Sequence, residues 1–347
     1  MNIYFLDSEF KERYVLDVFQ SLIWTKRYYT AGDFELYTPA TAEITSMLAA
    51  CPYISRDDDD GGVMIVENIK VTTDVENGNF YTISGRSLES ILSRRIVSGA
   101  DTHQFTIETD DAAEVIYQLV KINIGESAAE NRTVENFVTD TTFTYPADIK
   151  MQITGKNLVD AVSDICQTYG FGYRVTLDNG NIVFALYEGN ITDVTFSAEF
   201  DNLINSDYEY NGENLKNVAY IAGEGEGTAR KWTDVNSSAY SGLDRRELFV
   251  DARDISSNNG EISENNYYDM LAARGSEKLA EQQIVKAFSG NIEPQTTYRY
   301  KKDYNLGDIV SVDNGYGVTA APRIIEIIEC WDDTGYKVVP TFEKWEV

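Results

Sequence analysis

The sequence V-M-I-V-E-N-I-K-V at residues 63–71 runs into E-N-G-N at 76–79 and returns as F-Y-T-I at 80–83. Runs of β-branched and aromatic residues on both sides of Asn77-Gly78 predict a β-hairpin, because a two-residue type I′ turn requires positive φ at both central residues. D-N-G-N at 178–181 predicts a second hairpin. D-N-G at 313–315 predicts a third, between 308–312 and 323–328, and D-T-G at 333–335 turns the chain into 336–340. The chain is therefore expected to be mainly antiparallel sheet.

Three stretches show the 3.6-residue spacing of amphipathic helices. Asn157 is placed to cap the first helix and Gly170 to end it. The second helix begins near residues 110–111, in a D-x-x-E box with Glu114. The third and longest runs from about 264 to 287. The apolar positions expected to be buried are Leu158, Ala161, Val162, Ile165 and Cys166 in the first helix, Ile116, Leu119 and Val120 in the second, and Tyr268, Leu271, Ala272, Gly275 and Leu279 in the third.

Residues 82–92 and 152–162 resemble each other at an offset of 70 residues. Each segment reads as a strand, a Ser/Thr-Gly pair, a basic residue, a capping residue and a helix with Leu in its first turn. A structural duplication and a chance match both account for this similarity. Together with the hairpins, these segments predict a β-rich α+β protein.

Acidic residues dominate the charge: 57 Asp and Glu against 29 Lys and Arg give a net charge of −28. Such a surface repels polyanions, so the composition excludes a nucleic-acid binder that works by charge and disfavours anionic membranes. A length of 347 residues with 43 % hydrophobic residues predicts two or three folded domains. Asp7 and Glu9 interrupt the apolar N-terminal run, which indicates a first strand rather than an export signal. No stretch approaches the roughly 20 apolar residues that span a bilayer.

Histidine and cysteine are scarce, which excludes whole classes of reaction. His103 is the only histidine, and Cys51, Cys166 and Cys330 stand far apart, so the sequence encodes neither a zinc site nor a disulfide framework. His103 lies in an alternating, strand-like stretch with no nucleophile motif around it, and we expect an ordinary histidine. No carboxylate pair is distinguished among the 57 acidic residues. We therefore predict no catalytic, cofactor-binding or metal-ligating residue, no cofactor and no enzymatic activity.

Two motifs could suggest ligand sites: a run of acidic residues and a segment in which glycine and glutamate alternate. The run Asp57-Asp58-Asp59-Asp60-Gly61-Gly62 could bind calcium, but a calcium loop alternates its ligands, whereas four consecutive Asp side chains diverge. We expect a solvated hairpin loop there. G-E-G-E-G at 223–227 lacks the Lys-Ser/Thr of a phosphate loop, and its glutamates would repel phosphate, so we expect a mobile connection.

The aromatic residues allow two interpretations. They could form a sugar-stacking platform, but more often such residues make cross-strand pairs and interface anchors in a β-rich protein. The aromatic residues in question include Trp24, Tyr28, Tyr29, Trp232, Trp331 and Trp345.

Residues 24–39 (W-T-K-R-Y-Y-T-A-G-D-F-E-L-Y-T-P), 74–78 (D-V-E-N-G) and 84–92 (S-G-R-S-L-E-S-I-L) resemble the siphovirus tail proteins of Gram-positive phages and prophages. These proteins are similar to the N-terminal part of tail-associated proteins and to the baseplate hub of contractile phages. The resemblance spans nearly the whole chain, through the long helix before 288–291 and the strand at 306–310.

The resemblance implies a fold of two small antiparallel β-barrel domains flanking an α+β domain. The expected boundaries are 1–100 for the first barrel, 101–199 for the middle domain and 200–347 for the second barrel, with a long helical insertion at about 226–288. The second barrel would then be split between about 200–225 and 285–347. The two barrels are expected to share one topology.

The resemblance also implies a structural hub at the virion tail tip or baseplate, made in the cytoplasm of the bacterial host. Three copies would form a homotrimeric ring that closes or extends the tail tube and adapts its sixfold symmetry to a threefold tip. The implied partners are the distal tail protein ring, the tail tube and the tape-measure protein. DNA would pass through without specific binding, and no segment would span a membrane.

Many relatives continue into a lysin or receptor-binding extension, whereas this chain ends at residues 343–347 after a strand, so we expect those activities in another protein. A tail-associated cell-wall hydrolase and a carbohydrate-binding tail adhesin are the alternatives. A trimer would carry 3 × −28 = −84. That charge could line the channel and repel DNA, or could simply keep the protein soluble.

Overall fold

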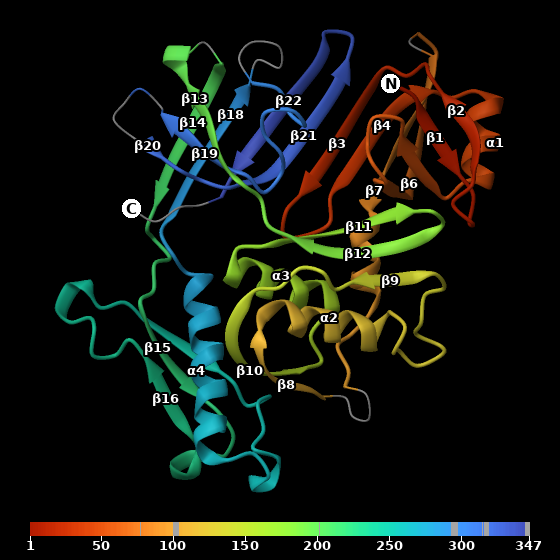
Figure 1. Cartoon of the computed structure of the whole chain (residues 1–347). Coiled ribbons are helices and arrows are strands. Elements are labelled where there is room, and N and C mark those ends of the chain that lie inside the picture. The colour runs from red at the N-terminus through yellow and green to blue at the C-terminus, as the bar shows by residue number, and fades with distance from the viewer. Residues whose placement is uncertain are drawn as a thin grey trace.

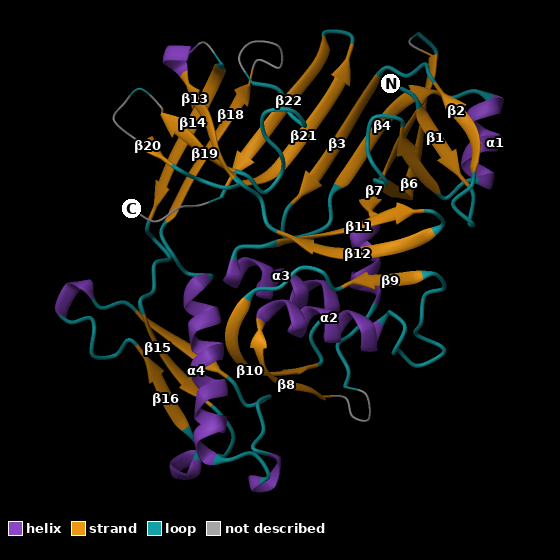
Figure 2. Ribbon diagram, in the orientation of Figure 1, coloured by secondary structure: helices purple, strands orange, loops and turns teal. Residues whose placement is uncertain are grey.

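The computed structural model describes residues 1–76, 78–99, 104–200, 202–292, 298–313, 315 and 319–343. The protein is β-rich α+β, as the sequence predicts. A broad curved sheet lies across the top of the view, a smaller α+β layer lies beneath it, and a helix-containing excursion extends below the C-terminal half (Figures 1 and 2). Within the described residues, no helix is both long and apolar enough to cross a lipid bilayer.

The broad sheet contains eleven strands and joins the two ends of the chain. In spatial order its strands are β14 (Leu203–Asn211), β18 (Val285–Ile292), β22 (Gly335–Phe342), β21 (Ile324–Asp332), β3 (Ser21–Arg27), β4 (Asp33–Pro39), β7 (Gly78–Ser87), β6 (Val63–Asp74), β5 (Tyr53–Arg56), β1 (Ile3–Leu6) and β2 (Glu12–Leu16).

Two apolar cores lie against one face of this sheet. In β4, Phe34, Leu36 and Thr38 are buried while the residues between them face outward, as the twofold alternation of a strand requires. The N-terminal core also includes Ile44 and Met47 of α1 (Ala42–Ala50). The C-terminal core is built from β21 and β22 together with β13 (Ile191–Ser197) and β19 (Ile309–Asp313).

The predicted hairpins form, with two differences. Asn179 and Gly180 have φ of 47° and 83° between the paired residues Asp178 and Asn181, as a type I′ turn requires. In the first hairpin Asp74 pairs with Gly78, so Gly78 is the first residue of β7 rather than the centre of a two-residue turn. Asn77, on which that prediction also rested, lies outside the described residues.

The hairpin predicted at 313–315 has a different partner. Strand β19 pairs with the short β20 (Thr319–Ala320), and Ile309 also forms an antiparallel bridge with Arg323, so the predicted pairing holds only at that end. Residues 324–328 lie in β21, which pairs with β22 and β3. Residue Asn314 is outside the described part of the chain. The turn at 333–335 joins β21 to β22, as predicted, with Asp332 paired to Gly335.

The middle layer contains two helices on two small sheets. Asn157 caps α3 (Leu158–Tyr169) and Gly170 ends it at φ 78°, while Asp111 caps α2 (Ala112–Asn123), so both predicted helices are confirmed. Its strands are β8 (Gln104–Asp111), β9 (Phe137–Asp140), β10 (Pro146–Thr154), β11 (Gly172–Asp178) and β12 (Asn181–Tyr187). His103 lies just outside the described residues.

The segments at 82–92 and 152–162 differ in structure. Residues 152–162 form the predicted strand, turn and helix. In the first segment Gly85 lies inside β7, and the residues after it form only a short 3₁₀ helix, Leu88–Arg94. The two segments meet each other, because Asn157 Nδ2 donates a hydrogen bond to the carbonyl of Ser93.

An excursion of residues 212–284 leaves the broad sheet after β14 and returns at β18. It contains β15 (Val218–Ala222), β16 (Trp232–Val235) and β17 (Glu247–Asp251), covered on one face by α4 (Glu264–Ala280). The third predicted helix is therefore too long: residues 285–287 start β18, because pairing with β14 replaces the helical hydrogen bonds. The buried face of α4 contains Tyr267, Met270, Leu271, Gly275 and Leu279, whereas Tyr268 and Ala272 are half-buried. Short 3₁₀ helices occur at Ala198–Phe200, Gly227–Ala229, Gly242–Asp244 and Asn258–Gly260.

The two halves of the broad sheet repeat one strand order. Four of the N-terminal strands are, in chain order, β3, β4, β6 and β7, and in space they run β3-β4-β7-β6, beyond which β5, β1 and β2 continue the sheet. The C-terminal strands are β14, β18, β21 and β22, and in space they run β14-β18-β22-β21. Both sets therefore place the first, second, fourth and third strands side by side, and every pairing within both sets is antiparallel.

Tyr28, just after β3, lies where the N-terminal half, the middle layer and the C-terminal half meet. Its ring is fully buried, and a Cβ atom added to Gly172 or Gly307 would lie 2.4 Å from its Cε2. The guanidinium of Arg323 lies 5.4 Å from the ring centroid. Two glycines thus allow the backbones of the other two parts to contact this ring directly.

We expect Gly172→Ala to lower the free energy of unfolding by about 1–3 kcal/mol, the usual cost of overpacking a close contact. Chemical denaturation measures the change. Gly212→Ala is the matched control, since the nearest atom to its added Cβ lies 3.7 Å away. If both variants unfold at the same denaturant concentration, Tyr28 does not hold the three parts together.

Candidate functional site

The junction between β3 and β21 joins the two halves of the sheet. The strands are antiparallel, from Arg27 opposite Glu326 to Leu22 opposite Trp331. On the outer face Arg27 Nε lies 2.7 Å from Glu326 Oε2, and Arg27 also binds Asp33 of β4 at 2.5 Å. Residues separated by about 300 positions are thereby locked into one register.

A buried cluster of charges lies on the core face of this junction. Arg56 of β5 and Glu329 of β21 are 3 % and 1 % exposed, with Arg56 Nη2 3.2 Å from Glu329 Oε2. The Arg56 guanidinium lies 5.0 Å from the ring centroid of Trp24 and 4.3 Å from that of Trp331. Tyr336 of β22 donates a hydrogen bond of 2.8 Å to Glu329. Four strands therefore contribute to one cation–carboxylate contact sandwiched between indole rings.

Asp59 extends the cluster and changes the interpretation of the acidic run. The expected solvated loop is wrong for this residue, which is only 6 % exposed, although Asp57 and Asp60 are exposed. Asp59 forms an ion pair with Lys26 of β3 and accepts a hydrogen bond of 3.0 Å from Trp24 Nε1. One of the four neighbouring carboxylates is therefore buried, and it fastens the acidic run to β3.

The local field keeps these groups ionised. Burial alone would raise the pKa of Asp59, but attraction and hydrogen bonding by Lys26, with the charge of Arg56, hold the pKa below its usual value. Burial would lower the pKa of Arg56, and the nearby carboxylates, Glu329 foremost, raise it instead. Both groups therefore stay charged inside the protein at neutral pH.

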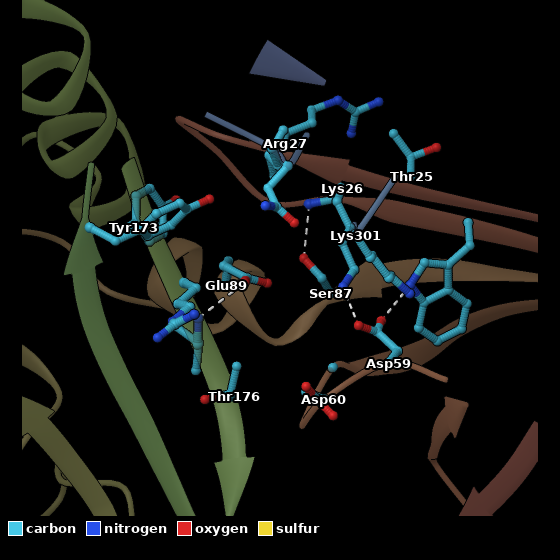
Figure 3. Close-up of a pocket in the computed structure, with 18 of the residues that line it drawn as sticks. Thr25, Lys26, Arg27, Asp59, Asp60, Ser87, Glu89, Tyr173, Thr176 and Lys301 are labelled. Atoms are coloured by element: carbon cyan, nitrogen blue, oxygen red, sulfur yellow. Dashed lines mark hydrogen bonds and ion pairs between the residues drawn. The ribbon is translucent and has the colours of Figure 1, made fainter. Parts of the chain in front are cut away.

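A cavity of about 430 Å³ opens beside this cluster, between β3, the acidic run, β11 and residues 300–308. Figure 3 shows Lys26, Asp59, Ser87 and Glu89 around it. Glu89 accepts a hydrogen bond from the Val175 amide, and burial raises its pKa. Among the described residues that line this cavity there is no histidine or cysteine. Lys26 and Asp59 form an ion pair beside this cavity, which holds β3 against the acidic run.

The sequence matches the Siphovirus ReqiPepy6 Gp37-like protein family over residues 1–342. The chain belongs to this phage tail protein family. Solved structures with a similar fold include the 43 kDa tail protein of prophage MuSo2 from Shewanella oneidensis, at 14 % identity and TM-score 0.61 over 99 % of this chain and 98 % of that one. The prophage tail protein gp18 from Listeria monocytogenes EGD-e matches at 12 % identity and TM-score 0.56, over 100 % and 96 %.

A tail protein from Neisseria meningitidis MC58 matches at 11 % identity and TM-score 0.55, over 99 % of this chain and 96 % of that chain. At these identities the similarity establishes a shared fold. Comparison with curated proteins gives no match. The resemblance to siphovirus tail proteins noted in residues 24–39 and 84–92 is confirmed by the family match.

Three carboxylates of this chain come together away from the junction. Oxygen atoms of Asp164, Glu277 and Glu281 lie within 4.8 Å of one another, on α3 and at the end of α4. The ammonium of Lys156 binds Asp164 and lies 3.2 Å from Glu277. The lysine thus occupies the position of a cation, and the cluster fastens α4 to the middle layer.

The remaining sequence motifs have structural contacts. In the glycine-rich segment 223–227, the Glu224 amide donates to the Tyr267 hydroxyl and the Arg230 guanidinium donates to the Gly223 carbonyl, so the expected mobile connection is fastened at both points. Trp24, Tyr28 and Tyr29 are buried, which excludes them from a sugar-stacking surface, and Trp331 stacks on Arg56 and Tyr336. Trp232 is exposed, and Trp345 lies outside the described residues.

Sequence reasoning missed the partners that make the junction site. Arg56 precedes the acidic run directly, and Glu329 interrupts the apolar stretch I-I-E-I-I-E-C-W at 324–331. A charge in an otherwise apolar strand is a signal of a buried ion pair, because an unpaired charge would be too costly there. Nothing local to residue 329 points to residue 56, however.

Replacing Asp59 should test the buried cluster. In Asp59→Asn the half-buried Lys26 loses its counterion, and we expect the free energy of unfolding to fall by about 3–5 kcal/mol, the range for breaking a buried pair. Asp60→Asn, in the next and exposed position, should change it by less than about 0.5 kcal/mol. Urea unfolding of both variants measures this, and two equally small effects would restore the solvated-loop interpretation.

The same pair has a predictable dependence on pH. Because the pKa of Asp59 is lower in the folded state, its stabilising contribution is present above the unfolded value of about 3.9 and is lost as the pH falls through the folded value. The stability difference between the wild type and Asp59→Asn should therefore be constant from pH 7 to about 5 and shrink below about 4. A difference that grows on acidification would contradict the assignment.

Proposed function

We propose that this tail protein is a non-catalytic structural hub at the tail tip or baseplate. In this proposal three copies form a ring that closes or extends the tail tube, adapts sixfold symmetry to threefold, and leaves a channel for the genome. Membership of a phage tail protein family supports the location in a virion tail.

The repeated strand order is the observation that carries the proposal. Within its eleven-stranded sheet one chain contains two sets of four strands with the same strand order, joined through β3 and β21. Three chains would supply six such sets, which is the number needed to match a sixfold tube with a threefold assembly. A protein with a single such set would need six copies.

The proposed domains follow from this arrangement. We assign residues 1–100 to the first unit, 101–199 to the middle unit and 200–347 to the second, as the family resemblance implies. The insertion in the second unit corresponds to residues 212–284, which separate β14 from β18. The equivalent connection in the first unit, between β3 and β4, is only the loop at 28–32.

The charge on the outer face of the sheet bears on DNA passage. Opposite the cores, acidic and basic side chains alternate and are largely paired, as in Arg27 with Asp33 and Glu326, and Lys337 with Asp332. If this face surrounds the channel, the wall carries more acidic than basic side chains. Two roles of the net charge of −28 are therefore compatible with this face: an acidic channel wall that repels DNA, and a charged surface that maintains solubility. The charged side chains of this face on the described strands include the acidic Asp33, Glu35, Glu67, Asp74, Glu209, Glu326 and Asp332 and the basic Arg27, Lys70, Arg86 and Lys337.

The partners proposed for this hub are a second and third copy, the distal tail protein ring, the tail tube and the tape-measure protein. Neither specific nucleic-acid binding nor a membrane span forms part of the proposal. Synthesis would take place in the host cytoplasm, followed by assembly into the tail.

We expect the purified chain to have a mass in solution of three times 39.1 kDa and to appear in negative stain as a hollow threefold ring. Light scattering over a range of protein and salt concentrations measures the mass, since screening should favour association of chains that each carry −28. A chain that stays monomeric at high concentration and high salt would contradict the hub proposal.

A further inference from the structure

The junction inside one chain indicates how two chains would meet. Within the chain, the third strand of the C-terminal set (β21) pairs with the first strand of the N-terminal set (β3). Applying the same rule to a neighbouring copy pairs the third strand of the N-terminal set (β6) with the first strand of the C-terminal set (β14). We propose that β6 of one copy and β14 of the next form an antiparallel strand pair; this inference rests on the proposed ring.

Strand β6 has an edge available for this pairing. It is twelve residues long, and β5 pairs only with its first three residues, Val63–Ile65. Residues Glu67–Asp74 pair with β7 on one side and are exposed throughout, including Ile69 at 46 % and Val71 at 55 %. In the described part of the chain no strand pairs with the other edge of this segment. An unpaired strand edge of this length is a template for pairing with another chain.

Strand β14 supplies the complementary edge. It forms one end of the broad sheet and, among the described strands, pairs with β18 alone. Tyr208 and Tyr210 are 38 % and 60 % exposed, which provides aromatic surface that a neighbouring strand could cover. Each junction uses the β6 edge of one copy and the β14 edge of the next. An open row of copies therefore leaves one β6 edge and one β14 edge unpaired at its two ends, whereas a closed ring pairs every edge.

The matched turns predict the register. The pair Asp74–Gly78 closes the β6–β7 hairpin in the same way that the pair Asp332–Gly335 closes the β21–β22 hairpin. Counting three residues back from each aspartate makes Val71 equivalent to Glu329. The terminal pairs Asn211–Val285 and Thr25–Asp33 make Tyr210 equivalent to Trp24. Glu329 lies opposite Trp24 in the chain's own junction, which places Val71 opposite Tyr210 of the next copy.

This register is favourable in packing, whereas its charges are mixed, because Asp74 comes directly opposite Asp207 while Lys70 approaches an acidic residue. A Val–Tyr cross-strand pair buries two side chains that are more than half exposed in the single chain. The exposed Lys70 comes diagonally opposite the exposed Glu209, so opposite charges meet. An attractive pair at the junction matters between chains that each carry −28. The occupant that these edges fit is therefore a second copy of this chain.

A disulfide trap tests the pairing. In the double variant Val71→Cys, Tyr210→Cys, oxidation should give covalent dimers and closed trimers on a non-reducing gel, several-fold more than the wild type, whose Cys51 and Cys166 are buried. Mixing the two single variants should give only covalent dimers, because one chain then supplies its new thiol on β6 and the other supplies its new thiol on β14. Each single variant alone should not cross-link, since the junction joins different edges.

The matched control is Val15→Cys, Tyr210→Cys, which probes β2 at the far end of the sheet, where Val15 is 50 % exposed. A trimeric mass without the Val71–Tyr210 link, or with the Val15–Tyr210 link instead, overturns the strand pairing and leaves the hub proposal intact. A monomeric mass with no cross-link contradicts both. A cross-link in Val71→Cys alone would show a twofold contact between β6 edges and overturn the head-to-tail pairing.

Discussion

The pairing of β3 with β21 is the constraint on which the arrangement of the whole chain depends. It joins strands about 300 residues apart into a single sheet, and its core face is closed by Arg56, Glu329 and the two flanking indoles. A buried ion pair adds little net stability compared with apolar packing, but misalignment leaves a charge unpaired in the interior. A slip of β21 by one residue would also turn Glu329 to the opposite face. The cluster therefore selects one register of the junction.

That register sets the distance and angle between the two four-stranded sets, and the contacts of Tyr28 with Gly172 and Gly307 fix the middle layer against the same joint. The two strand sets thus belong to one continuous sheet rather than to two domains on a linker. In a ring built from three such chains, half of the junctions between strand sets would be the β3–β21 junctions already formed inside each chain. Only the remaining joints would have to be made by association, where each chain loses translational and rotational freedom.

Local sequence patterns predicted the parts that local chemistry controls. Asn157, Gly170 and Asp111 cap and end helices where expected, and Asn179-Gly180 forms its turn. The errors arise where a distant strand decides the outcome: the long helix ends at Ala280 because 285–292 pairs with β14, and Asp59 is buried because Lys26 and Trp24 come from β3. No spacing in the sequence encodes a partner 33 residues earlier in the chain or, for Arg56 and Glu329, 273 residues away.

The two strand sets share their strand order, but what surrounds them differs. In the N-terminal half β1 pairs antiparallel with β5 and α1 covers the core, whereas in the C-terminal half β13 pairs parallel with β19. The excursion 212–284 enters at a strand connection and leaves the edges of β6 and β14 accessible, and a long loop costs little extra closure entropy. Three copies would therefore present a sixfold ring of strand sets bearing two alternating kinds of attachment. In the proposed hub this combination would serve symmetry adaptation, because the side that meets the tube would repeat six times while the side that carries the tip would repeat three times.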